Sequence, residues 1–196
     1  RIELERLLGR ELLQYKRELL KLFGRHGHIR HSLDCDREPA AASIALDFVN
    51  VHQGFWDLSD EGERALFAAT TDLVLDEPRF RIPGTSHFLV SADNPLNKMI
   101  HKIAAPAYQG RSCWPTFNVE FADRMLDYDE CSGTDKYRAC ARDILRDIRT
   151  ATETHGGYQE LLSETGLKYR TWAYQGAVAH SWFPRFLTVW KRAFGA

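Results

Sequence analysis

Two short stretches carry the residues of this sequence that are best suited to chemistry. The first, residues 108–118, reads Tyr-Gln-Gly-Arg-Ser-Cys-Trp-Pro-Thr-Phe-Asn and combines aromatic rings with the planar cation of Arg111. The second, residues 156–166, reads Gly-Gly-Tyr-Gln-Glu-Leu-Leu-Ser-Glu-Thr-Gly and places the carboxylate of Glu160 just after a Gly-Gly turn. Aromatic rings beside a carboxylate are the side chains that a sugar-binding site needs.

A carboxylate in such a setting is suited to the inverting hydrolysis of a glycoside. That reaction uses two carboxyl groups about 6.5–9.5 Å apart, one as the base that activates water and one as the protonated acid. Backbone N–H groups near the Gly-Gly turn can keep Glu160 ionised, as a base requires. The guanidinium of Arg111 can hold sugar hydroxyls or a carboxylate, and the rings of Tyr108 and Trp114 can stack on the C–H faces of a pyranose.

Each of these residues also has a plainer structural explanation. Glu160 in a loop is compatible with a solvated surface carboxylate, and Arg111 with an ordinary ion-pair partner. Trp114 precedes a proline, so it can simply start a helix and pack its ring into the core. Asn118 lies one helical turn later and can satisfy loop carbonyl groups. The sequence alone leaves these alternatives open.

Composition sets limits on the class of protein. The chain has 196 residues, 44% of them hydrophobic and 27% charged, with a formal net charge of -1. Such values are typical of one globular domain and predict no general attraction to nucleic acid. No run of about 18 apolar residues occurs, so we predict no membrane span.

Cysteine and histidine spacing gives no sign of a metal or other cofactor, and we predict none. The four cysteines form no CxxC pair, which argues against a zinc cage. The sequence does not decide whether Cys131 and Cys140 form a disulfide. It therefore does not decide whether the cellular compartment is oxidising. His26 and His28 lie near each other in sequence, but no acidic ligand stands at a firm spacing, so we interpret this segment as a solvated basic turn.

Hydrophobic periodicity and helix stop signals predict an all-α fold built from helical hairpins. No stretch shows convincing strand alternation, and the long connection before residue 114 predicts irregular loops on one face. The proline at 184 predicts a bend within the last helix. The predicted helices cover residues 1–23, 40–51, 61–75, 115–128, 136–154 and 171–194.

Several short motifs follow one another in an order that resembles a known group of enzymes. In chain order they are Gly54-Phe-Trp, Asp76-Glu-Pro-Arg-Phe80, Pro83-Gly84, Ser91-Ala-Asp93, Tyr108-Gln-Gly-Arg-Ser-Cys-Trp-Pro115 with Asn118, Gly157-Tyr-Gln-Glu160, Glu164-Thr-Gly166 and Thr171-Trp172. This order resembles the C-terminal half of the (α/α)6-barrel inverting glycoside hydrolases. The pattern is most similar to processing α-glucosidase I and bacterial glucosidases, and more loosely to trehalases and neutral invertases.

The resemblance implies that residues 1–196 are one all-α domain, the C-terminal portion of a larger (α/α)6 toroid that cleaves an α-glucoside or a related α-glycoside. It implies that Glu160 is the general base and that Trp172 lies near the sugar pocket at the start of the last inner helix. It also implies that the loop after position 107 lines this pocket. The sugar-binding candidates are Tyr108, Arg111, Trp114, Asn118, Trp172 and Trp56.

The general acid of the resembled enzymes has no match in this chain. In those enzymes it is an aspartate in an upstream Trp-Asp segment, whereas Trp56-Asp57 falls at the place of a different loop. We therefore expect the acid, and the rest of the barrel, to come from a longer chain or from another subunit. A half barrel leaves apolar flanks uncovered, so the isolated chain is expected to associate.

Two other functions stay open at this stage. A chain without its acid can serve as a non-catalytic helical module that binds carbohydrate or assembles with a partner. The third hypothesis is a helical adaptor protein that binds no sugar and uses the leucine-rich stretch at 2–23 to contact a partner.

Overall fold

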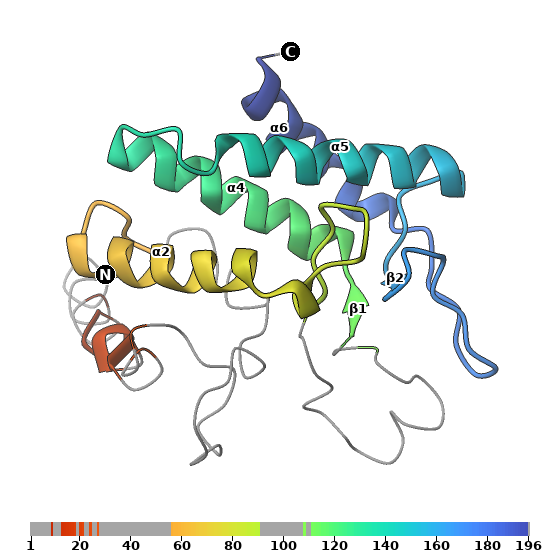
Figure 1. Cartoon of the computed structure of the whole chain (residues 1–196), viewed down its shortest axis with the longest axis horizontal. Helices are drawn as coiled ribbons and strands as arrows, with labels where there is room; N and C mark the ends of the chain where they lie inside the picture. The colour runs from red at the N-terminus through yellow and green to blue at the C-terminus, as the bar shows by residue number, and fades with distance from the viewer. Residues whose placement is uncertain are drawn as a thin grey trace.

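The computed structural model describes residues 56–90, 108 and 111–195, together with residues 9, 13–18, 20, 21, 24 and 27 (Figure 1). Residues 13–18 and 20–21 are helical, in agreement with the predicted first helix. The rest of that helix, and the whole helix predicted at 40–51, lie outside the described residues.

The described part of the chain is mainly helical, which confirms the predicted class. It contains the α-helices α2 (Glu61–Asp76), α4 (Pro115–Ser132), α5 (Arg138–His155) and α6 (Phe183–Phe194), and the 3-10 helices η3 (Pro78–Phe80) and η4 (His180–Trp182). Two strands of two residues each, β1 (Ser112–Cys113) and β2 (Leu162–Ser163), pair antiparallel. The sequence did not predict these strands, because two residues are too few to show alternation.

Local signals explain where the helices begin and end. The side chain of Asp60 accepts a hydrogen bond from the N–H of Glu63 and so caps α2. Pro115 occupies the first turn of α4, as predicted from the Trp-Pro pair. Gly133 and Gly156 end α4 and α5 with left-handed backbone angles, φ 67° and 68°, which glycine adopts without steric cost.

The predicted start of the last helix is wrong. A helix was expected from Thr171, but α6 begins at Phe183, and Pro184 stands in its first turn rather than at a bend. Residues 171–179 instead form turns and isolated bridges, with Thr171 N–H bonded to the carbonyl of Tyr174 at 2.7 Å. Gly176, inside the predicted helix, favours this outcome because glycine is a poor residue for a helix interior.

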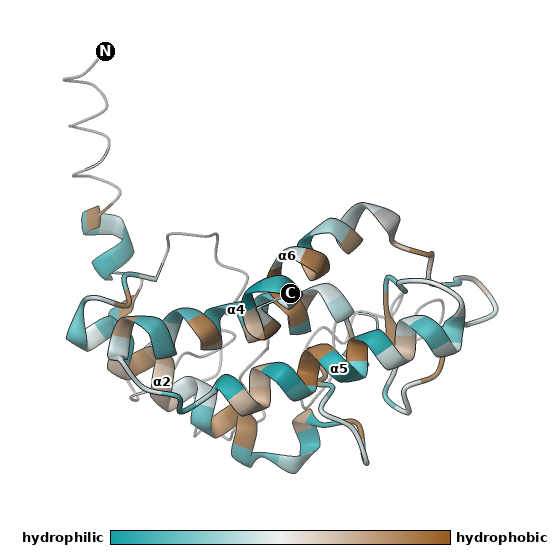
Figure 2. Cartoon of the chain, turned by 90° about the horizontal axis from the view of Figure 1, so that it is seen from above, coloured by the Kyte–Doolittle hydropathy of each residue, from teal (hydrophilic) through white to brown (hydrophobic). Residues whose placement is uncertain are grey.

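The helices pack in layers around one main hydrophobic core. Helices α4 and α5 form an antiparallel hairpin, α2 runs alongside α4, and α6 crosses behind the hairpin (Figure 1). All four alternate hydrophobic and hydrophilic stretches, as amphipathic helices do (Figure 2). The core includes Phe67 and Val74 of α2, Phe121 and Met125 of α4, Ile144, Leu145 and Ile148 of α5, and Phe186 and Val189 of α6.

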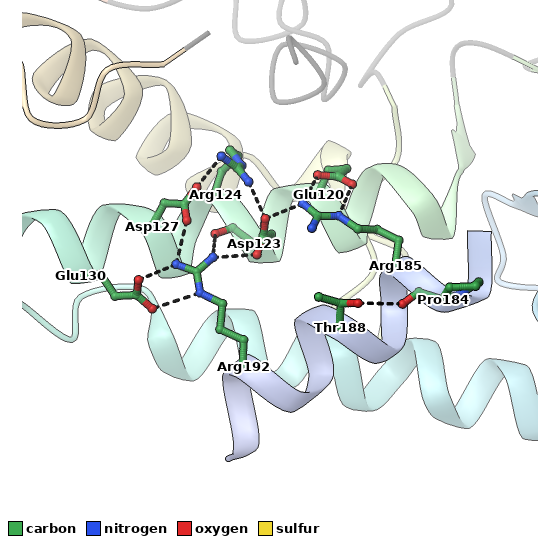
Figure 3. A network of polar contacts seen from close by, with 9 residues as sticks. All are labelled: Glu120, Asp123, Arg124, Asp127, Glu130, Pro184, Arg185, Thr188 and Arg192. Atoms are coloured by element: carbon green, nitrogen blue, oxygen red, sulfur yellow. Dashed lines mark hydrogen bonds and ion pairs between the residues drawn. The ribbon is translucent and has the colours of Figure 1, made fainter. Parts of the chain in front are cut away.

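An ionic ladder joins α4 to α6 (Figure 3). Arg185 donates to Glu120 at 2.7 and 2.8 Å and to Asp123 at 2.6 Å. Arg192 pairs with the other oxygen of Asp123 at 2.7 Å; it also reaches the carboxylates of Asp127 and Glu130. Because Arg185 and Arg192 lie two turns apart on α6, the ladder fixes which face of α6 meets α4.

The β1–β2 pair closes the free end of the α4–α5 hairpin. Strand β1 runs directly into α4, and β2 follows shortly after α5, so their pairing ties the start of one helix to the end of the other. The chain from 80 to 90 adds to this corner, where Val90 N–H bonds to the carbonyl of Ser112 at 2.8 Å. The corner positions both stretches that the sequence singled out.

Candidate functional site

The segment that carries Glu160 is held in place by a second extended segment, residues 177–179. Glu160 donates its N–H to the carbonyl of Ala177 at 2.8 Å, and Ala179 donates to the carbonyl of Tyr158 at 2.7 Å. Gly157 makes this approach possible: its φ is 150°, and a Cβ there would lie 2.9 Å from a methyl carbon of Val178. A side chain at 157 would therefore push the two segments apart.

The carboxylate of Glu160 accepts three hydrogen bonds. Its Oε1 accepts from the hydroxyl of Tyr108 at 3.0 Å. Its Oε2 accepts from the hydroxyl of Tyr174 at 2.5 Å and from the N–H of Ala177 at 3.0 Å. None of these donors carries a charge, so the carboxylate is oriented without being neutralised.

Hydrogen bonding sets the ionisation of this group. Partial burial is the largest single influence and raises the pKa of Glu160, but the bonds from Tyr174, Ala177 and Tyr108 together outweigh it and hold the pKa below its ordinary value. Burial, with Glu160 adding to it, raises the pKa of both Tyr174 and Tyr108. The site therefore consists of an ionised carboxylate between two protonated tyrosines.

Aromatic rings surround the tyrosine hydroxyls. The ring of Tyr108 meets three others edge-on, those of Trp114 at 5.1 Å, Tyr174 at 5.2 Å and Tyr169 at 6.3 Å between centroids. Edge-to-face contacts of this kind add about 0.5–1.5 kcal/mol each beyond burial. Trp114, Tyr169 and Leu161 are buried, and the half-buried rings of Tyr108 and Tyr174 pack against them. The buried rings thus support the two tyrosines whose hydroxyls bind the Glu160 carboxylate.

The structure brings Glu160 and Tyr108 into direct contact and gives Trp114 a supporting position. Only 9% of Trp114 is exposed; its ring stacks on Phe117 at 5.3 Å. The indole N–H donates to the carbonyl of Tyr108 at 2.9 Å, and Ser112 Oγ donates to the same oxygen at 2.7 Å. Trp114 therefore holds the Tyr108 turn in place rather than presenting a ring face to solvent.

Asn118 is fully buried and serves the backbone of a neighbouring segment. Its Oδ1 accepts from the N–H of Phe88 at 2.7 Å, and its Nδ2 donates to the carbonyl of Phe88 at 2.9 Å. The side chain thus replaces a strand partner for residue 88. Asn118 positions the 80–90 segment beside β1 and has no exposed surface for a ligand.

The other three predicted binding residues each have different surroundings. Arg111 forms an ion pair with Glu164 at 2.6 Å, across the β1–β2 corner. Trp172 is 81% exposed at a turn, two residues from Tyr174. Trp56 is buried in the main core against Phe67 of α2, with ring centroids 5.5 Å apart. Among these, Trp172 has the largest exposed fraction.

The sequence missed Tyr174 and the N–H of Ala177. Both fall inside the helix wrongly predicted from Thr171, a segment in which Trp172 was the residue expected near the pocket. A usable signal was present, because the Thr-Trp-Ala-Tyr-Gln-Gly stretch combines a threonine that can close a turn with a glycine two residues after the tyrosine.

Metal and thiol groups show no cluster in the described residues. No group of three or more His, Cys, Asp or Glu side chains there could hold a metal ion. Cys131 and Cys140, whose pairing the sequence left open, are both free thiols. Within the same residues, none of the helices is long and apolar enough to cross a membrane.

Comparisons of the chain with protein families, with curated proteins and with solved structures gave no significant match.

Proposed function

We propose that Glu160 is the general base of an inverting glycoside hydrolase acting on an α-glucoside or a related α-glycoside. The observation that carries the proposal is the setting of its carboxylate: uncharged donors hold it ionised, and two of them are tyrosines of an aromatic cluster. An ionised carboxylate is the form that accepts a proton from water. The half-buried rings of Tyr108 and Tyr174 would be the ones next to a bound sugar.

The proposed reaction uses the two oxygens of Glu160 differently. Oε2 accepts from Tyr174 and Ala177 and so fixes the carboxylate plane. Oε1 accepts only from Tyr108 among the described residues, which leaves it a lone pair for water. The water attacks the anomeric carbon, its proton passes to Oε1, and the glycosidic bond breaks. A second carboxyl group protonates the departing oxygen.

We propose that this second group, the general acid, comes from outside the described residues. The proposed source is the remainder of an (α/α)6 toroid, in a longer chain or another subunit, completed around the α4–α5 hairpin. The β1–β2 corner would then present Glu160 at the mouth of the ring. No cofactor is required, because both proton transfers use carboxyl groups.

Replacement of Glu160 by Gln tests the proposed role in a protein that contains the complete barrel. The expected result is a loss of about 10²–10⁴-fold in kcat for an α-linked glucoside, with folding retained. Glu164→Gln is the matched control, since it removes an exposed carboxylate four residues away that pairs with Arg111. Equal activity of the two variants would rule out Glu160 as the base.

The exposure of Trp172 favours one alternative, a non-catalytic carbohydrate-binding module. Trp172 is 81% exposed, and the stacking of an indole on a sugar ring does not require a catalytic acid. Titration of the chain with glucose, maltose and other α-linked disaccharides, followed by tryptophan fluorescence, tests this function. Binding that Trp172→Ala abolishes, in a complete protein without hydrolytic activity, would select the binding module.

A further inference from the structure

An apolar groove lies between α6 and the C-terminal half of α5, on the opposite side of α6 from the residues that anchor it to α4. Its volume is about 320 Å³. Four of its seven lining residues are apolar and come from successive turns of α6; the lining consists of Phe183, Phe186, Leu187, Trp190, Arg149, Thr152 and Glu153. Leu187 is 43% exposed at its edge.

The groove is unsuited to a sugar or another polar small molecule. Its floor is made of Phe186 and the rings beside it, and a polar ligand left there would lose its hydrogen bonds to water without replacement. The polar atoms lie on one rim only, at Arg149, Thr152 and Glu153. An apolar side chain from a protein surface is the occupant that this chemistry accepts.

The surface around the groove is firmly held. Arg185 and Arg192 bind α6 to the carboxylates of α4. On the other side of α6, the guanidinium of Arg149 lies 5.6 Å from the ring centroid of Trp190, and that of Arg146 lies 5.3 Å from the centroid of Phe194. The groove is therefore a preformed surface, which lowers the entropic cost of docking.

The charges on the rim point to a specific occupant. Arg149 and Glu153 lie one helical turn apart on α5 and pair with each other at 2.8 Å, with 60% and 64% of their side chains exposed. An exposed pair of this kind contributes only about 0–1 kcal/mol, so its members can exchange partners cheaply. A two-fold axis passing between them would place each arginine opposite the glutamate of the other copy.

We propose that the occupant is a second copy of this chain, bound about a two-fold axis so that Leu187 of each copy enters the groove of the other. Around this apolar centre, Arg149 of each copy pairs with Glu153 of its neighbour, and the rim is self-complementary in charge. This inference concerns the α5–α6 surface alone and does not depend on the proposed sugar chemistry at Glu160.

Sedimentation velocity of the 196-residue chain tests the proposal. The expected result is a concentration-dependent dimer that Leu187→Glu weakens at least about tenfold in dissociation constant, because it buries a charge in an apolar groove. The matched control is Leu167→Glu, which places the same charge at a residue 65% exposed in the turn after β2. This control is expected to leave the dimer unchanged, and circular dichroism checks that both variants fold.

A charge exchange between two exposed positions tests the two-fold arrangement. In a dimer of the Arg149→Glu variant, one glutamate faces another at each of the two contacts, and in a dimer of Glu153→Arg one arginine faces another. Each variant alone is therefore expected to dimerise more weakly than the wild-type chain. Mixing the two restores opposite charges at both contacts and is expected to restore a dimer containing one copy of each variant.

Three results would overturn the proposal. A wild-type chain that stays monomeric from low micromolar to submillimolar concentration would leave the groove to a different partner. A dimer that Leu187→Glu and Leu167→Glu affect equally would place the contact elsewhere. Failure of the mixed charge variants to associate, while the wild-type chain dimerises, would exclude the two-fold pairing.

Discussion

Two carboxylates, Asp123 and Glu160, show how differently one chain can treat the same functional group. Asp123 is almost fully buried on α4 and pairs with Arg124, Arg185 and Arg192. Glu160 is half-buried in a loop, and its partners within the described part of the chain are two tyrosine hydroxyls and a backbone N–H. Both carboxyl groups have a pKa below their ordinary value despite their burial.

The difference in partners indicates which of the two carboxylates, Asp123 or Glu160, can take part in a reaction. The charge of Asp123 is compensated by arginines whose geometry fixes α6 on α4, so its role is to join helices. The charge of Glu160 is oriented but not compensated by any cation among residues 56–90 and 111–195, so it can still attract a proton or a cationic transition state. A lowered pKa alone does not separate the two; the nature of the partners does.

The largest effect is expected from Asp123→Asn. Removing the negative charge leaves arginines on α4 and α6 that have lost a buried partner, and we expect a destabilisation of about 3 kcal/mol. Urea denaturation followed by circular dichroism measures it. Asp143→Asn is the control, since that carboxylate pairs with Arg146 on an exposed face. A change below about 0.5 kcal/mol for Asp123→Asn would show that the ladder is not a source of stability.

Asn118→Ala is expected to lower the free energy of unfolding by about 2 kcal/mol, the second-largest effect after Asp123→Asn. The change leaves the N–H and C=O of Phe88 buried without the amide that satisfies both. Urea denaturation measures the loss, and the fluorescence of Trp114 is expected to shift because its loop loosens. An Asn118→Ala protein as stable as the wild type would contradict this role.

Tyr174→Phe is expected to have a smaller effect on stability, about 1 kcal/mol, and a clear effect on Glu160. The variant removes the shortest hydrogen bond to Oε2, so the pKa of Glu160 should rise. Tyr169→Phe is the matched control, since Tyr169 lies in the same ring cluster and makes no hydrogen bond to Glu160. If both substitutions changed the pKa of Glu160 equally, the hydrogen bond from Tyr174 would not be the cause of the lowered pKa.

Acid is expected to weaken both regions, and salt is expected to weaken the ladder more than the hydrogen bonds of Glu160. A carboxyl group whose pKa is lower in the folded than in the unfolded state contributes stability above its unfolded pKa. That contribution is lost as the pH falls through the folded pKa. Because both Asp123 and Glu160 have lowered pKa values, urea denaturation across the acid range should show the loss, which Glu160→Gln should reduce. Salt should weaken the exposed Arg192–Glu130 contact more than the Glu160 hydrogen bonds.

The helical part of the fold was predictable because its signals are local. The Asp-Glu-Pro stop after α2, the Trp-Pro start of α4 and the Gly-Gly end of α5 each act within a few residues, and the structure places all three as predicted. Apolar spacing in α5 also predicts that Ala139, Ile144, Leu145 and Ile148 face inward; the last three are buried, whereas Ala139 is exposed. These helices are long enough for the apolar pattern to repeat several times, so single residues that depart from the pattern do not hide it.

The site was predictable only in part, because its contacts join segments that local patterns do not relate. The motifs around Tyr108 and Glu160 were recognised from the sequence, and the structure brings these two side chains together. Tyr174 was hidden inside an apparent helix, since periodicity continued across a stretch that tertiary contacts hold extended. Asn118 illustrates the reverse: the resemblance implied a ligand contact, whereas the structure agrees with the plainer alternative, since its amide satisfies the backbone of Phe88.

The central claim, an ionised Glu160 held by tyrosine hydroxyls, is tested most directly by a pH titration of its side-chain carboxyl carbon by NMR. The account predicts a pKa below the ordinary value for glutamate in the wild-type chain, and a rise toward that value in Tyr174→Phe but not in Tyr169→Phe. A wild-type pKa at or above the ordinary value, or one that Tyr174→Phe leaves unchanged, would contradict it.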